Sequence, residues 1–138
     1  MDYSKKVVDH FINPRNAREI ADASGVGTVG NARCGDIMRV FLKIEDGHVV
    51  DASFKTFGCG AAVATSSIAT EMVKGKSIED AIKITNQEVV EALDGLPTAK
   101  VHCSVLAREA LHAALWDYAK KEGITIEGLC PPSENHEH

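Results

Sequence analysis

The chain has 138 residues, of which 44% are hydrophobic and 25% charged, and its formal net charge is -5. These values suit one globular domain, and the acidic balance without a Lys/Arg stripe argues against a nucleic-acid partner. No apolar run is long enough to span a membrane and the polar start has no signal-peptide pattern, so we expect a cytoplasmic protein with no membrane contact.

A helix and then a weak strand are predicted at the N-terminus. Residues 2–11 form an amphipathic pattern ended by Asn13-Pro14, with four apolar positions, Val7, Val8, Phe11 and Ile12. Residues 23–33 hold three glycines and predict an edge strand or an irregular loop.

Two alternating segments follow. Residues 37–44 place Met38, Val40, Leu42 and Ile44 on one face, and residues 49–57 do the same with Val50, Ala52 and Phe54. Asp46-Gly47 between them is a turn signal, so the two segments predict an antiparallel hairpin. Because each strand has a polar side, we expect one solvated face and one face covered by helices.

The second half of the chain is predicted to be helical. Residues 60–75 suit one helix, Ser77 and Asp80 open another, and Thr85 with Glu88 forms a capping box for a third. The longest helix carries an apolar stripe and ends at Gly123; the stripe consists of Ala107, Leu111, Ala114 and Tyr118. The expected fold class is α+β, a small antiparallel three-stranded sheet with helices packed on one face. It would form one domain over residues 1–128, followed by a flexible acidic tail over residues 129–138.

Three cysteines stand out by their neighbours. They occur in the strings Cys34-Gly35-Asp36, Gly58-Cys59-Gly60 and His102-Cys103-Ser104, too far apart for a local zinc motif. Each lies at a predicted element end, where backbone amides favour a thiolate and glycines leave room for a ligand. In a reducing compartment such cysteines serve metal binding, catalysis or burial rather than structural disulfides.

Three thiolates with one harder ligand suit tetrahedral iron or zinc. Asp36 and His102 are the alternatives for the fourth ligand, and the residues do not decide between them. The simpler interpretations are also open: each cysteine could be a buried thiol, His102 a helix cap and Asp36 a turn former. The shared context of the three strings favours a metal site made of Cys34, Asp36, Cys59, His102 and Cys103.

These strings resemble the IscU scaffold proteins of iron-sulfur cluster assembly and the N-terminal domain of NifU. The resemblance covers about the first 120 residues and also rests on four further strings, Tyr3-Ser4-Lys5-Lys6-Val7, His10-Phe11-Ile12-Asn13-Pro14-Arg15-Asn16, Lys55-Thr56-Phe57-Gly58-Cys59-Gly60 and Glu71-Met72-Val73-Lys74-Gly75-Lys76. It implies the SufE/NifU-like fold, namely a small antiparallel three-stranded sheet with helices packed on one face.

The resemblance also implies a function. Such a scaffold takes persulfide sulfur from a cysteine desulfurase of the IscS or NifS type, combines it with iron and passes a 2Fe-2S cluster to apo iron-sulfur proteins. Cys34, Cys59 and Cys103 match the ligand positions, Asp36 tunes cluster lability, and His102 and Lys100 adjoin the cluster. The resemblance also implies that Cys103 is the favoured persulfide acceptor. The chain would be a carrier and not an enzyme, with zinc in the cluster-free form and a homodimer or a frataxin-like partner as open alternatives.

Four further points concern the partners and the alternatives. The chaperone recognition string of the family, Leu-Pro-Pro-Val-Lys, is altered here to Leu96-Pro97-Thr98-Ala99-Lys100, which puts a heat-shock chaperone partner in doubt. The second interpretation is a zinc-bound SufU-type protein that relays persulfide, but those relatives carry an insertion before the last cysteine and lack the preceding histidine. A cysteine hydrolase using Cys103 with His102 is disfavoured because adjacent side chains point apart. Cys130 is expected to be a dispensable thiol of the tail.

Overall fold

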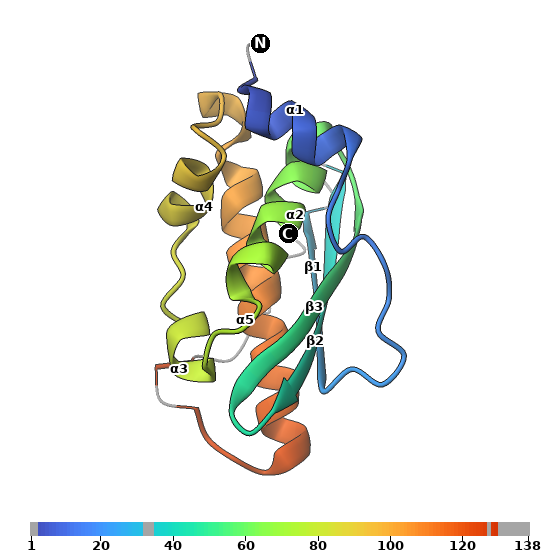
Figure 1. Ribbon diagram of the computed structural model, residues 1–138, viewed down its shortest axis with the longest axis vertical. Coiled ribbons are helices and arrows are strands. Elements are labelled where there is room, and N and C mark those ends of the chain that lie inside the picture. Colours follow the sequence, from blue (N-terminus) through green and yellow to red (C-terminus); the bar gives the residue numbers. More distant parts are fainter. Residues whose placement is uncertain (1–2, 32–34, 127, 130–138) are drawn as a thin grey trace.

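The computed structural model describes residues 3–31, 35–126 and 128–129, in which three antiparallel strands form one sheet. The sheet order is β1 (Gly25–Asn31), β2 (Asp36–Glu45) and β3 (His48–Phe57). The helices are α1 (Lys5–Ile12), α2 (Gly60–Val73), α3 (Ile78–Ala81), α4 (Asn86–Ala92), the short 3-10 helix η1 (Thr98–Lys100) and α5 (His102–Glu122). Figure 1 shows α2 and α5 along one side of the sheet, with α3 and α4 outside them. The predicted fold class is confirmed.

The hairpin of β2 and β3 carries the core face of the sheet. Its β2 positions are buried as the alternation predicted, at Met38, Val40, Leu42 and Ile44. In β3 the prediction for Val50 was wrong: this side chain is 50% exposed, whereas Val49 is buried. The pairing register shifts between Lys43 and Ile44, a β-bulge that leaves Val50 without an opposite residue and reverses the direction in which it points.

The opposite face of the sheet is covered in part by the segment between α1 and β1. Arg18 donates two hydrogen bonds to the Asp51 carboxylate, and Lys43 pairs with Asp22. The Asn16 carbonyl accepts a hydrogen bond from the Phe54 amide. The expectation of a solvated face therefore holds only beyond this segment, because the segment uses the polar side chains of the strands as partners.

The edge strand β1 is a regular strand and not a loop, and it lies unusually close to α5. A Cβ added at Gly25 or Gly27 would come within 3.0 Å of backbone atoms of Ala114, and at Gly27 also of the Ala110 carbonyl. The glycines therefore let the helix backbone touch the strand. At the free edge, the Val26 amide donates to the Asp117 carboxylate of α5 at 2.9 Å.

The helix boundaries agree with the capping signals. Ser77 accepts from the Asp80 amide, Thr85 and Glu88 form the predicted capping box, and Gly123 ends α5 in the left-handed conformation. The 3-10 turn η1 was not anticipated from the sequence. It leads the chain directly into α5 and so places Lys100 next to the start of that helix.

Helix α1 packs on α2 through a narrow face. Val7 and His10 are buried, whereas Val8, Phe11 and Ile12 are exposed, so most of the predicted apolar face does not enter the core. The hydroxyl of Ser67 in α2 lies 2.7 Å from His10 Nδ1 and accepts a hydrogen bond from the Arg15 amide. Burial holds the pKa of His10 below its ordinary value.

This burial predicts a pH-dependent stability. Because the pKa of His10 is lower in the folded chain than in the unfolded chain, protonation of His10 favours unfolding. The stability linked to neutral His10 is fully present above its unfolded pKa of about 6.5 and is lost as the pH falls through the lower folded value. Between about pH 7.5 and pH 5.5 the parent should lose about 1 kcal/mol or less of its free energy of unfolding through His10, and His10→Gln should lack this part of the loss. Urea unfolding at both pH values measures it. The exposed His48→Gln is the control, and an equal pH dependence in the His10 variant and parent would contradict the prediction.

Candidate metal centre

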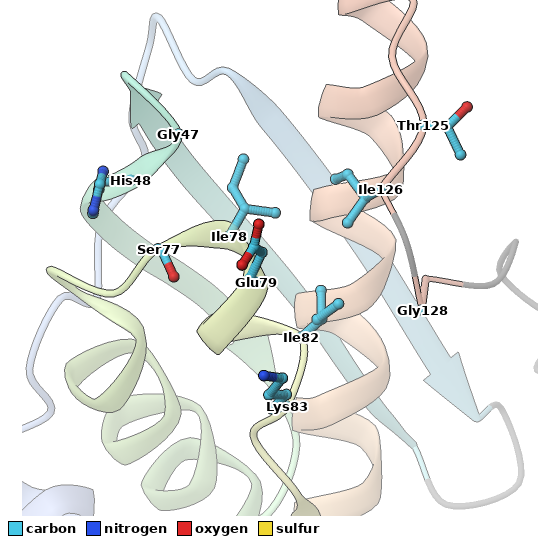
Figure 2. A pocket seen from close by; sticks show the side chains of 10 residues that line it. All are labelled: Gly47, His48, Ser77, Ile78, Glu79, Ile82, Lys83, Thr125, Ile126 and Gly128. Atoms are coloured by element: carbon cyan, nitrogen blue, oxygen red, sulfur yellow. The ribbon is translucent and has the colours of Figure 1, made fainter.

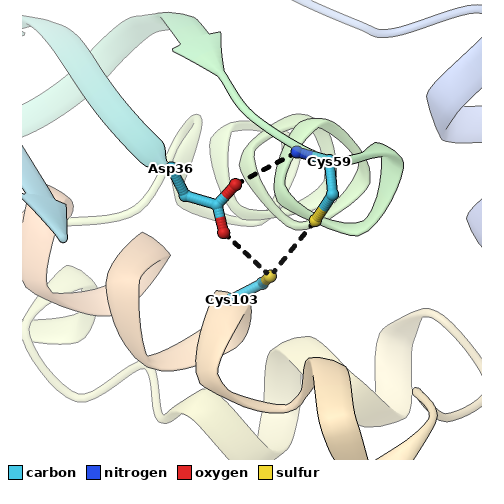
Figure 3. Close-up of side chains that lie close together, drawn as sticks. All are labelled: Asp36, Cys59 and Cys103. Carbon is cyan, nitrogen blue, oxygen red and sulfur yellow. Dashed lines mark hydrogen bonds between the residues drawn. The ribbon is translucent and has the colours of Figure 1, made fainter. Parts of the chain in front are cut away.

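Asp36, Cys59 and Cys103 meet at one end of the sheet, although they come from three distant parts of the chain. One carboxylate oxygen and the two sulfurs all lie within 4.8 Å of one another. The two Sγ atoms are 3.8 Å apart, and Cys103 Sγ lies 4.0 Å from Asp36 Oδ2 (Figure 3). Two thiolates bound to one tetrahedral zinc, with Zn–S near 2.3 Å, would be separated by about 3.8 Å. The spacing therefore fits two ligands of one metal ion.

The Asp36 carboxylate is held by the loop that enters α2. Asp36 begins β2 and is buried, and its Oδ1 accepts a hydrogen bond from the Cys59 amide at 3.0 Å. A Cβ at Gly58 would lie within 3.0 Å of that same oxygen. Gly58 therefore makes room for the carboxylate. The sequence marked this glycine only as a place of close approach, and no pattern revealed which group approaches it.

Helix starts position both cysteines. Cys59 is the N-cap residue of α2, and Cys103 is the second residue of α5. Both cysteines therefore lie at the positive end of a helix dipole, which favours thiolates and the negative charge of a three-anion ligand set.

Burial acts against the charged form of one thiol. Cys103 has no exposed surface, and its pKa is raised, first by burial and then by the charge of Cys59. Lys100 opposes this rise. The pKa of Lys100 is itself raised, mainly by the charge of Cys59. A bound cation would reverse the balance at Cys103, because metal coordination displaces a thiol proton.

His102 presents one ring nitrogen to the same group. Its Nδ1 lies 3.1 Å from the Ala99 carbonyl, which can only accept, so Nδ1 carries the proton. Nε2 then lies 3.4 Å from Asp36 Oδ2 and 3.6 Å from Cys103 Sγ. The expectation that the adjacent side chains of His102 and Cys103 point apart was therefore wrong, because both turn toward Asp36 at the start of α5. A backbone hydrogen bond that fixes the other nitrogen is the usual arrangement of a metal-binding histidine. The alternatives of ligand and neighbour both stay open, since His102 is not among the three residues whose ligand atoms all lie within 4.8 Å.

The remaining predicted residues are placed as follows. A cavity of about 560 Å³ opens beside the centre and is lined by Gly35, Asp36, Gly58, Cys59, Lys100 and His102. Cys34 and Cys130 lie outside the described residues, so the ligand role of Cys34 stays a prediction.

A larger hollow of about 950 Å³ lies at the opposite end of β2, beside the β2–β3 turn (Figure 2). Its lining includes His48, Glu79 and Lys83 but none of the predicted site residues.

The position of Gly58 predicts a weaker metal site when a methyl group is added. Gly58→Ala should displace the Asp36 carboxylate and lower zinc affinity about 10-fold, the usual cost of misplacing a ligand. Competition with a chromophoric chelator measures the affinity. Gly75→Ala is the control for an added methyl group away from the site: a Cβ there meets no atom within 4 Å, and its positive φ of 83° adds only local backbone strain. Unchanged affinity in Gly58→Ala would show that this glycine does not position the carboxylate.

The fold and this thiol and carboxylate group describe a small α+β protein with a candidate metal-binding group at one end of its sheet. Residues 2–125 match the family model described as the NifU-like N terminal domain. An iron-sulfur cluster assembly scaffold protein IscU of Archaeoglobus fulgidus is 60% identical over 121 residues, covering 88% of this chain and 79% of that protein. The IscU protein of Aquifex aeolicus is 50% identical over 128 residues, covering 91% and 82%.

The solved structures agree in fold. A putative iron-sulfur cluster assembly scaffold protein for the SUF system from Fervidobacterium islandicum matches with a TM-score of 0.69 at 22% identity, covering 82% of this chain and 96% of that one. The chain belongs to the NifU-like N-terminal domain family. Among the described residues, no helix is long and apolar enough to cross a bilayer.

Proposed function

We propose that this chain is a scaffold on which an iron-sulfur cluster is assembled and from which it is passed on. The observation that carries the proposal is the meeting of Asp36, Cys59 and Cys103, with ligand atoms within 4.8 Å, in a chain 60% identical to a named scaffold protein. The cluster is cargo: the thiolates and the carboxylate bind its iron, and the adjoining cavity gives access to it.

The finer parts of the proposal concern the cargo and its partners. A 2Fe-2S cluster would be held by Cys34, Cys59 and Cys103 with Asp36 or His102, and zinc would take the same ligands in the cluster-free form. A cysteine desulfurase would supply the sulfur and apo iron-sulfur proteins would receive the cluster. The desulfurase performs the bond breaking, so the scaffold itself is not an enzyme. A reducing compartment such as the cytoplasm keeps Cys59 and Cys103 in the free form that the structure shows.

A reconstitution experiment tests the scaffold function. The full chain is incubated without oxygen with iron, cysteine and a cysteine desulfurase, and the visible absorption and the iron and sulfide content are measured. We expect a cluster that then transfers to an apo-ferredoxin. Tightly held zinc, with persulfide transfer but no cluster, would instead establish a zinc-bound relay. The 3.8 Å sulfur separation also suits that second function.

Asp36 gives a separate prediction about release. Its oxygen is the only hard ligand atom in the group of three, and an oxygen ligand holds iron less firmly than a thiolate and leaves a route for solvent and acceptors. Asp36→Ala should therefore lengthen the lifetime of an assembled cluster several-fold. The decay of visible absorption under a chelator measures it, with Asp80→Ala, an exposed position in α3, as control. Equal lifetimes in Asp36→Ala and parent would remove Asp36 from the release step.

A further inference from the structure

The hollow of about 950 Å³ beside the β2–β3 turn has an apolar wall. Figure 2 shows Ile78 and Ile82, at the two ends of α3, on one side of it and Ile126 on the other. These three isoleucines pack against the core but are only half-buried, so part of each apolar surface faces the hollow. An apolar wall that no described side chain covers favours an apolar occupant.

The described part of the chain ends beside this hollow. Gly128 lines it with a positive φ of 85°, and a Cβ there would lie 3.3 Å from Ile82 Cδ1. The Leu129 amide donates a hydrogen bond to the Ile126 carbonyl at 3.2 Å, and the Leu129 side chain packs against the core. The chain therefore passes close to α3 at the last residues that the structure describes.

The residues that come next in the sequence have the length and the chemistry for that wall. After Leu129 the chain continues as Cys130-Pro131-Pro132-Ser133-Glu134. Three extended residues span about 10 Å, so the two prolines are within reach of the isoleucines. Proline is restricted to an extended backbone of this kind and loses little conformational freedom on docking. The short connection through Leu129 also gives the prolines a high effective concentration at the hollow.

The charges at the rim agree with an acidic occupant. Lys83 lines the hollow and, within the described part of the chain, forms no ion pair. The tail carries two carboxylates beyond the prolines, Glu134 and Glu137. Glu79 lines the same hollow and would keep these carboxylates on the Lys83 side. Because an exposed ion pair contributes little, the apolar wall supplies most of the attraction.

We propose that residues 130–134 dock in this hollow of their own chain, with Pro131 and Pro132 packed against the three isoleucines. The segment acts as a strap that ties α3 to the chain after α5, at the end of the sheet opposite the candidate metal centre. For these residues the strap replaces the expectation of a flexible tail. The inference does not depend on the scaffold function, because none of the predicted site residues lines the hollow.

Nuclear Overhauser spectroscopy of the full chain, with labelled isoleucine methyl groups and proline rings and under reducing conditions, tests the proposal. We expect cross-peaks between the two proline rings and the methyl groups of the three isoleucines. The double variant Pro131→Gly, Pro132→Gly should lose these cross-peaks and shift the three methyl signals. The methyl signal of Ile37, which follows Asp36 at the other end of β2, should stay unchanged.

A second double variant, Asn135→Gly with His136→Gly, is the matched control. It adds two glycines further along the tail, so it should keep the cross-peaks and the three methyl signals of the parent. Parent protein without proline–isoleucine cross-peaks would overturn the proposal, as would methyl signals that are the same in the proline variant and the parent. A mixture of proline-labelled and isoleucine-labelled chains tests the remaining alternative. Cross-peaks between the two labels in that mixture would place the segment on a second copy and contradict docking within one chain.

Discussion

Cys103→Ser is expected to lower zinc affinity about 100-fold and to prevent stable cluster formation. Structural zinc sites with four ligands bind with roughly 10–16 kcal/mol, so one strong ligand corresponds to about 3 kcal/mol, which is about 100-fold. A serine hydroxyl does not deprotonate to give a soft anion, so it cannot replace the thiolate. Cys59→Ser should behave alike, because its sulfur lies 3.8 Å from that of Cys103, the separation expected for two thiolates on one metal ion.

Zinc affinity by chelator competition and iron and sulfide content after reconstitution measure this loss. Circular dichroism checks that the variants fold, since Cys103 lies in the core cluster. Cys130→Ser is the control with the same chemical change in the predicted tail, and it should bind like the parent. Parental affinity in both site variants would mean that the metal is held elsewhere in the chain.

Gly27→Ala is expected to give the largest loss of stability. The new methyl group would come within 3.0 Å of Ala114 N and the Ala110 carbonyl oxygen, both backbone atoms of α5 that no rotamer change can move. The helix must then shift away from β1, and overpacking of this kind costs about 3 kcal/mol or more. Urea unfolding followed by circular dichroism measures the change in free energy of unfolding.

A second glycine separates this contact from the general effect of adding a methyl group. Gly47 lies in the β2–β3 turn with a positive φ of 74°, and a Cβ there would meet no atom within 4 Å. Gly47→Ala should therefore cost only the strain of its backbone conformation, about 1–2 kcal/mol. A Gly27→Ala chain no less stable than Gly47→Ala would show that α5 does not depend on the close approach.

The sequence predicted local structure better than it predicted which residues meet. The caps at Ser77 and Thr85 and the alternation of β2 depend on neighbouring residues, and the structure confirms them. Val50 was placed on the wrong face because a bulge depends on the partner strand, which alternation within one strand does not reveal. The burial of the apolar residues of α1 was overestimated, because only tertiary packing decides how much of a helix face is covered.

The site followed a similar division. The glycine and acid neighbours of the cysteines indicated a metal site, and the structure brings Asp36, Cys59 and Cys103 together. The sequence gaps of 23 and 44 residues between these positions say nothing about their separation in space. The strand register and the helix packing determine that separation. Gly27 was one of three glycines in a segment predicted as an edge strand or an irregular loop, because a glycine needed for contact with a distant helix has the same local sequence as one needed for a turn.

The centre takes one residue from the start of β2, one from the start of α2 and one from the start of α5. In the unfolded chain these residues are far apart, so a metal or cluster that needs all three binds the native state alone. Binding and folding are then linked: a ligand present at about 1,000 times its dissociation constant adds about 4 kcal/mol to the free energy of unfolding. Delivery of the cargo removes this increment. The empty carrier is therefore the form most exposed to unfolding and proteolysis, and its abundance in a cell should depend on how quickly it is loaded again.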